Sequence, residues 1–454
     1  MNKIHSRGKI ILYALSGMGV NMLNLMMGSY LCSALLVGGF GAEAVPFQTF
    51  AQRDLVIAAV WAVFVLIAKI LDGIIDIPMA SFTDNLRTRW GRRRPALLIG
   101  FIPMIAAYLL FLLIPQNGAT LVNTIYFGVV LCLFYTAYTL TMVTYYATFT
   151  EIVDTVQERN LMSHAKSVYD IVYFILGYVV VRMLLNGMNI RLVALIVLPI
   201  ALTMMIPMFM IKEKDLRGVA GEKTEKISLF RSLALTFKNK TFILWMIAYA
   251  FMTFGVQLFL GGINEYFSFV KMNMMFIMMA SFAPVPLTLL LYNKIQKKYG
   301  FAVSFRYSLI MFSVGMLAMF GVSLLNPETH GTLRMVLSIV TGLISSFAIG
   351  ALFSVAYSIP SQLAADEEAK TGVANPAMYF AVQGLWSGVA TGIATGVVLV
   401  ALKGTESAAS DAIRYLTVIC AGGTLVSFLL TFLLPASLKK LGRQEKKSKE
   451  NIGV

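Results

Sequence analysis

Residues 69–95 read KILDGIIDIPMASFTDNLRTRWGRRRP, a mostly apolar run that contains a lysine and two aspartates and continues into an arginine-rich loop. On insertion scales, an aspartate or lysine at the centre of a membrane helix costs about 2.5 to 3.5 kcal/mol. Such side chains therefore face the interior of a helix bundle, pair with one another or line a wet cavity. The stretch predicts a membrane helix whose charges have a function or fix its packing.

The whole chain has the composition of an integral membrane protein. Of its 454 residues, 58% are hydrophobic and only 13% are charged, and its mean hydropathy is +0.77. Soluble domains carry about 25% charged residues, and runs of about 20 apolar residues mark membrane spans. We predict an all-α membrane protein with twelve transmembrane helices. The spans lie near residues 10–38, 55–79, 96–115, 121–149, 165–187, 191–211, 241–262, 274–293, 303–325, 332–357, 374–402 and 412–436.

A polar stretch between the sixth and seventh spans divides the chain. Six spans, a basic linker and six more spans are the layout of a transporter built from two halves. The predicted domains are a first six-helix half at residues 1–211, a cytoplasmic linker at 212–240, a second six-helix half at 241–436 and a basic cytoplasmic tail at 437–454.

The basic residues indicate how the chain is oriented. Its net charge is +15, and most of its 37 lysines and arginines fall in alternate loops and in the terminal segments. Cytoplasmic loops carry such an excess. We predict a multi-pass protein of the cell membrane with both termini in the cytoplasm. Membrane lipid, rather than nucleic acid, is the expected partner of the positive charge.

The three charges in the second span share one face of a helix. At 100° per residue, Lys69 and Asp76 lie about 20° apart around the axis, and Asp72 lies about 60° away. Two carboxylates one turn apart can coordinate a small cation or share a proton. The alternative is a structural ion pair that locks this span to a neighbour. Pro78 follows closely, where a broken backbone would expose carbonyl groups.

The arginine loop suggests a gate. Arginine side chains bridge carboxylates and the carbonyl groups at helix C-termini. We predict a latch that closes the two halves on the cytoplasmic side, and ordinary topology charges are the alternative. The predicted gating residues are Lys69, Asp84, Arg87, Arg92 and Arg93.

Residues 69–95 resemble the second-span signature of the glycoside–pentoside–hexuronide:cation symporters, a melibiose-carrier-like family of the major facilitator superfamily. The segments ERNLMSHAK (158–166) and ADEEAKTG (365–372) are similar to two further parts of that family. The resemblance implies the major facilitator fold with two pseudo-symmetric six-helix halves. It also implies alternating access, in which a cation drives symport of a small organic solute such as a sugar, glycoside or uronate.

The same resemblance implies a cation site. Its members are Asp72, Asp76 and Thr139. The family often has an asparagine just before the second acid, where this chain has Ile75. One oxygen ligand fewer weakens a sodium site more than a proton site, so H⁺ is favoured and Na⁺ stays open.

The implied substrate site departs from the family. Two sugar-binding aspartates are replaced here by Asn21 and Met142, Tyr146 stands at the place of a stacking tryptophan, and Lys166 stands at the place of an arginine. An expected lysine is absent near Trp386. Charge-assisted acceptors contribute roughly 1.5 to 3 kcal/mol each. Losing two of them keeps open a transporter of lipid-like or drug-like amphiphiles, or a non-transporting sensor.

Catalysis and resident cofactors are not expected. The three histidines are scattered, and the sequence has no H-E-x-x-H motif and no recognisable serine or cysteine nucleophile arrangement. We therefore expect that the protein is not an enzyme. Its expected ligands are a small-molecule substrate and a coupling ion, H⁺ or Na⁺. Each two-halved chain has its own central site, so a monomer is expected.

One further pattern predicts close helix packing. Gly384, Gly388, Gly392 and Gly396 recur every fourth residue in the eleventh span. Small residues at this spacing lie on one helix face and let a neighbouring helix approach closely.

Overall fold

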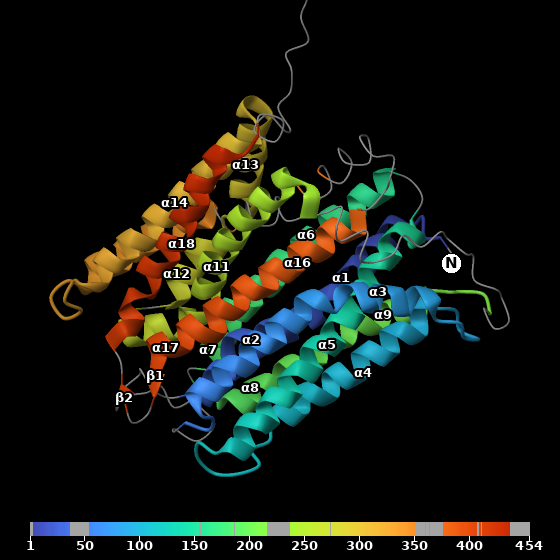
Figure 1. Cartoon of the computed structure of the whole chain (residues 1–454), viewed down its shortest axis with the longest axis horizontal. Helices are drawn as coiled ribbons and strands as arrows, with labels where there is room; N and C mark the ends of the chain where they lie inside the picture. The colour runs from blue at the N-terminus through green and yellow to red at the C-terminus, as the bar shows by residue number, and fades with distance from the viewer. Residues whose placement is uncertain are drawn as a thin grey trace, which may run out of the picture.

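The structure is a computed structural model, and all of its long elements are helices (Figure 1). It describes residues 3–36, 54–153, 156–185, 187–215, 237–272, 274–347, 349, 359, 363, 376–405, 408–409 and 411–435. Most of the predicted linker, the segment at 365–372 and the predicted tail lie outside these ranges.

The first half contains long helices and several short π- and 3₁₀-helical segments. Its elements are α1 (Arg7–Leu25), η1 (Met26–Leu31), η2 (Ser33–Leu35), α2 (Ala58–Ile74), α3 (Asp76–Asn85), α4 (Arg93–Phe111), α5 (Leu121–Ile152), α6 (Val156–Ile175), η5 (Leu176–Val180), α7 (Val181–Leu185), α8 (Ile190–Val197), η6 (Leu198–Met204) and α9 (Met205–Met210).

The second half is built in the same way and adds one pair of two-residue strands. Its elements are α11 (Lys240–Phe269), α12 (Met274–Phe282), α13 (Val285–Tyr299), α14 (Phe301–Ser323), a helix at Gly331–Phe347, α16 (Pro376–Gly392), η7 (Ile393–Val398), α17 (Leu399–Lys403), β1 (Gly404–Thr405), β2 (Ala408–Ala409), η8 (Asp411–Tyr415), α18 (Leu416–Leu430) and η9 (Thr431–Leu433). β1 and β2 pair antiparallel.

Ten helical stretches in the described part of the chain are long and apolar enough to cross a membrane. They match ten of the twelve predicted spans. The other two coincide with shorter helices, α2 with 17 residues and Gly331–Phe347. α2 gains length from α3, which follows after the single residue Ile75. The predicted all-α membrane fold is therefore confirmed, and two of its twelve spans rest on these shorter helices.

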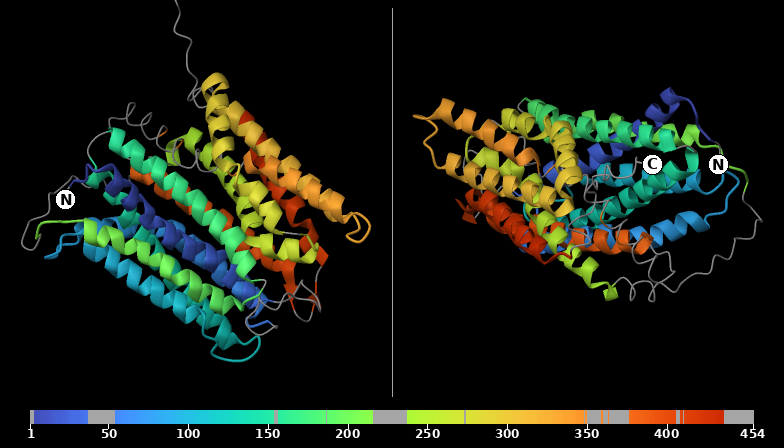
Figure 2. Two further views of the ribbon diagram at one scale, coloured as in Figure 1. Left: turned by 180° about the vertical axis from the view of Figure 1, so that it is seen from behind. Right: turned by 90° about the horizontal axis from the view of Figure 1, so that it is seen from above.

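The two halves meet along α2 and α16. Figure 1 shows this pair between α4 and α5 on one side and α14 and α18 on the other, and the helix contacts agree. In Figure 2 the blue-to-green first half and the yellow-to-red second half lie mostly on opposite sides. The functional site can therefore draw side chains from both halves.

The glycine pattern in α16 explains the closeness of this contact. A Cβ atom added at Gly388 would lie 2.4 Å from the carbonyl oxygen of Lys69, and one at Gly396 would lie 2.9 Å from that of Ala62. On the other helix, a Cβ atom at Gly73 would lie 2.7 Å from the carbonyl oxygen of Gly384. The prediction of close packing is confirmed, and its partner is the charged second span.

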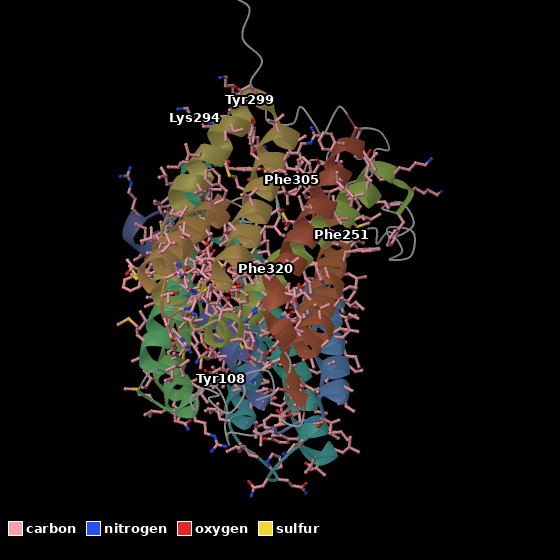
Figure 3. All side chains as sticks on the ribbon, turned by 90° about the vertical axis from the view of Figure 1, so that its left-hand side faces the viewer. Tyr108, Phe251, Lys294, Tyr299, Phe305 and Phe320 are labelled. Carbon is pink, nitrogen blue, oxygen red and sulfur yellow. The ribbon has the colours of Figure 1, made fainter. Side chains whose placement is uncertain are left out.

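Two ends of the bundle can be distinguished. At the N-terminal end, where α1 begins, the Ile4 amide donates to the Ile152 carbonyl over 2.9 Å. At the opposite end, the Leu55 amide donates to the Leu35 carbonyl over 2.9 Å. Figure 3 shows Tyr299, the last residue of α13, at one end of the bundle. Tyr108, which lies near the C-terminus of α4, is far from it toward the other end.

Candidate functional site

A cavity of about 200 Å³ lies between the halves. Its first-half lining comes from α1, η1, η2, α2, α5, α6 and η5, and its second-half lining comes from α11, α16, η7 and α17. Its polar lining residues are Asn21, Asn24, Ser29, Ser33, Lys69, Gln257, Glu265, Thr391, Thr395 and Lys403, and its aromatic ones are Trp61, Tyr135, Tyr173, Phe174 and Tyr178. Apolar and aromatic walls with a few polar groups are typical of small-molecule sites.

Hydrogen bonds join the two halves beside this cavity, toward the end of the bundle where Leu55 bonds to Leu35. The Asn264 side-chain amide donates to the Ser29 carbonyl over 2.8 Å. Lys403 donates to the Ser33 carbonyl, and its Nζ also lies 3.2 Å from the Ser33 hydroxyl. Each bond pairs a second-half helix with the segment that ends the first predicted span. Direct bonds therefore hold the two halves together beside the cavity at that end.

The second-span charges lie where α2 meets α5 and the cavity. The Thr139 hydroxyl, from α5, donates to Asp72 Oδ1 over 2.7 Å. Lys69 Nζ lies 3.8 Å from the centroid of the Tyr135 ring and lines the cavity. Asp72 is therefore a hydrogen-bonded carboxylate one helical turn after Lys69, which lines the cavity.

Asp76 begins a new helix. α2 ends at Ile74, and Asp76 is the first residue of α3, where the helix dipole favours a negative charge. Pro78 has no N–H group, so it cannot donate to the Ile74 carbonyl as a helical residue would. Asp76 Oδ2 lies 3.4 Å from the position that a Cβ atom of Gly384 would take. Carboxylate, hydroxyl and carbonyl oxygens of this kind suit H⁺ or a hard cation such as Na⁺.

Three of the predicted substrate residues belong to one polar cluster. Asn21 donates to Asp170 Oδ1 over 3.3 Å and accepts from the Tyr138 hydroxyl over 3.1 Å. Lys166 forms an ion pair with Asp170, and its Nζ lies 5.7 Å from the centroid of the Tyr146 ring. Among the residues that the structure describes, Asn21 is the cluster member that also lines the cavity.

The two remaining predicted substrate residues lie elsewhere. Met142 is 4% exposed, and Trp386 is 37% exposed on α16. Neither is among the described residues that line the cavity. The structure therefore brings together Asn21, Lys166 and Tyr146, and of the five predicted substrate residues Asn21 is the one found among the described lining of the cavity.

Sequence reasoning left three residues of the site unranked or unnoticed. Asp170 is the partner of both Asn21 and Lys166, and its place four residues after Lys166 was the available signal. Glu265 and Lys403 form an ion pair in the cavity with 3.4 Å between Oε1 and Nζ. They are far apart in sequence, so no local pattern joins them.

The arginine loop contacts the segment that follows α9. The backbone amides of Arg93 and Arg94 donate to Glu213 Oε2 over 2.8 and 3.3 Å, and Arg93 Nη1 donates to the Thr83 hydroxyl over 3.3 Å. These bonds tie the loop to the first half and to the start of the linker. The predicted latch between the halves is not tested by these bonds and stays a prediction.

The other predicted gating residues of the loop lie on α3 or between α3 and α4. Arg87 is exposed, and Arg92 is half-buried and caps the start of α4 with its backbone. The side chain of Asp84 lies outside the described part of the chain. Gly91 has a φ of +88°, and a Cβ atom there would lie 2.2 Å from Glu213 Cβ. The missing side chain of Gly91 therefore leaves room for Glu213 to pack against the loop.

Replacing Glu213 by alanine is expected to destabilise the first half by about 1 kcal/mol, because a carboxylate that caps a helix N-terminus contributes about that much. The thermal unfolding midpoint of the purified protein in detergent measures the effect. Glu328→Ala, in an exposed loop, is the matched control. Equal midpoints for the two variants would contradict this role of Glu213.

Comparison with known proteins connects this arrangement to a family. Residues 12–437 match the family described as MFS/sugar transport protein. No curated protein matches the sequence significantly.

Several solved structures share the fold. A mutant of the nucleoside transporter NupG superposes with a TM-score of 0.61 at 15% identity, covering 94% of this chain and 98% of that one. A mutant of the peptide transporter POT gives 0.62 at 12% identity, with 97% and 98% covered. A bacterial homologue of the human lysosomal transporter Spinster gives 0.58 at 13%, with 97% and 98% covered. At these identities the likeness shows the fold alone.

Proposed function

The chain belongs to the MFS/sugar transport protein family and is a secondary transporter of small solutes rather than an enzyme, and we propose that it is a cation-coupled symporter of a sugar, glycoside or uronate. The proposal places it among the melibiose-carrier-like symporters, which residues 69–95 resemble. It further places the chain in the cell membrane as a monomer, with the N-terminal end of the bundle in the cytoplasm.

The observation that carries the proposal is the bond between Thr139 and Asp72. It pairs a buried hydroxyl of α5 with a carboxylate of α2 over 2.7 Å. Lys69 lies one turn earlier on α2 and lines the cavity. A cation bound at Asp72 and Asp76 competes with Lys69 for the negative charge, so cation binding changes the charge that faces the solute. This competition is the proposed coupling.

The coupling ion follows from the oxygen atoms available. Asp72, Asp76 and Thr139 supply side-chain oxygens, whereas Ile75, at the break between α2 and α3, supplies none from its side chain. A sodium ion needs several oxygen ligands, and a proton needs one carboxylate. The arrangement favours H⁺, with Na⁺ as the second candidate.

Uptake into liposomes tests the proposal. The reconstituted protein is given a mixed panel of labelled sugars, glycosides, uronates and lysolipids under a proton gradient, a sodium gradient or no gradient. We expect one member of the first three classes to accumulate under one gradient only. Accumulation of a lysolipid alone, or uptake that no gradient changes, would overturn symport of a sugar-like solute.

A further inference from the structure

Glu265 is a buried carboxylate outside the proposed cation site. It belongs to α11, is 1% exposed and lines the cavity. Lys403 Nζ lies 3.4 Å from its Oε1, but Lys403 directs hydrogen bonds to the carbonyl and hydroxyl groups of Ser33. The ion pair offsets the charge of Glu265, but within the described residues neither of its oxygens accepts a hydrogen bond of good geometry. A buried carboxylate in that condition is costly unless something else supplies donors.

Two of the described lining residues have buried acceptor atoms that receive no hydrogen bond. Among the described lining residues, those with a buried polar atom that lacks a partner are Asn24, through Oδ1, and Glu265, through Oε1 and Oε2. Asn24 lies on α1 in the first half, and Glu265 lies on α11 in the second half. A solute that brings hydrogen-bond donors can therefore satisfy acceptors on both halves.

The charges of the cavity decide which donors fit. Lys69 and Lys403 both line it and disfavour a cationic ammonium group. Hydroxyl groups donate hydrogen bonds without a positive charge. Aromatic rings complete the wall, with Phe174 and Tyr178 stacked 5.9 Å apart, and they can cover the apolar face of a sugar ring.

We propose that Glu265 and Asn24 form an acceptor subsite that binds hydroxyl groups of a polyol solute, with neighbouring hydroxyls on the two oxygens of Glu265. The subsite rests on the proposed function. It supplies a charged hydrogen-bond acceptor in place of the family's two aspartates, whose positions are taken here by Asn21 and Met142. Because its members come from different halves, one solute bridges the halves when it binds. A phosphocholine headgroup has no hydroxyl donor and would bring a phosphate to Glu265, so it fits poorly.

Ligand-induced stabilisation tests the subsite in the purified full-length protein. The probes are methyl glucoside, methyl galactoside, methyl xyloside, glucuronate, their single deoxy analogues and lysophosphatidylcholine, each titrated against the thermal unfolding midpoint. The variants are Glu265→Gln, Glu265→Asp and the matched exposed control Glu328→Gln. If Glu265→Gln alone does not fold, Glu265→Gln with Lys403→Met removes both charges together.

We expect at least one polyol to stabilise the wild type and Glu265→Gln to raise its half-saturating concentration at least about tenfold. Glu265→Asp should recover part of the affinity, and Glu328→Gln should leave it unchanged. For one deoxy analogue the difference in affinity between wild type and Glu265→Gln should be smaller, because one of the two hydroxyls that donate to Glu265 is missing from it.

Two other outcomes overturn the inference in different ways. Equal affinity of a polyol for wild type and Glu265→Gln removes the subsite and leaves the symporter intact. Stabilisation by lysophosphatidylcholine alone, or by no polyol at all, removes both the subsite and the proposed solute class.

Discussion

Replacing Asp76 by asparagine is expected to lower gradient-driven accumulation of the solute at least about 100-fold. Asparagine keeps the shape of the side chain and one oxygen atom, but it neither takes up a proton nor attracts a cation. Removing one partner from a buried charge pair costs about 3 to 5 kcal/mol, which is a factor of about 100 or more in cation affinity. Solute exchange without a gradient should persist, because Asp76 is not among the described residues that line the cavity.

Three further variants sharpen this prediction. Asp72→Asn should behave like Asp76→Asn, whereas Thr139→Val should weaken accumulation only about tenfold, because it removes a single hydrogen bond to a charged group. Asp411→Asn is the matched control, since Asp411 is exposed at the start of η8. Uptake under the two gradients measures each effect. Full accumulation by the Asp76→Asn protein would make the second-span charges a structural lock.

The fold was predictable from the sequence because each membrane span is a contiguous run of apolar residues. A run of about 20 apolar residues must form a helix that satisfies its own backbone, whatever it packs against. The glycine spacing in α16 is local in the same sense, since four-residue steps return to one helix face. The structure adds the partner of that face, α2, which no pattern within residues 384–396 identifies.

The site was less predictable because its pairs join distant helices. Asp72 and Thr139 were linked only through a family resemblance. In the structure, the Thr139 hydroxyl lies 2.7 Å from Asp72 Oδ1. Glu265 and Lys403 lie on helices separated by several others in sequence, so no local pattern pairs them. Helix packing, rather than spacing along the chain, brings such side chains together.

Replacing Gly388 by valine is expected to destabilise the protein by about 3 kcal/mol and to prevent the transport cycle. The added Cβ atom would lie 2.4 Å from the backbone oxygen of Lys69, which cannot rotate away as a side chain could. Overpacking of a close contact costs about 1 to 3 kcal/mol, and two further methyl groups place valine at the upper end. α2 and α16 belong to different halves, so the same clash separates the halves at the helix that carries Asp72.

Unfolding midpoints and liposome uptake measure the two effects, and Gly422→Val is the matched control. Gly422 lies within α18, and a Cβ atom added there has no described neighbour within 4 Å. The control therefore carries the same change in helix propensity without the clash. Gly388→Ala should fall between wild type and Gly388→Val, because it adds the Cβ atom alone. Equal stability and uptake for Gly388→Val and Gly422→Val would show that α2 and α16 separate at little cost, and the glycines of α16 would then serve motion rather than packing.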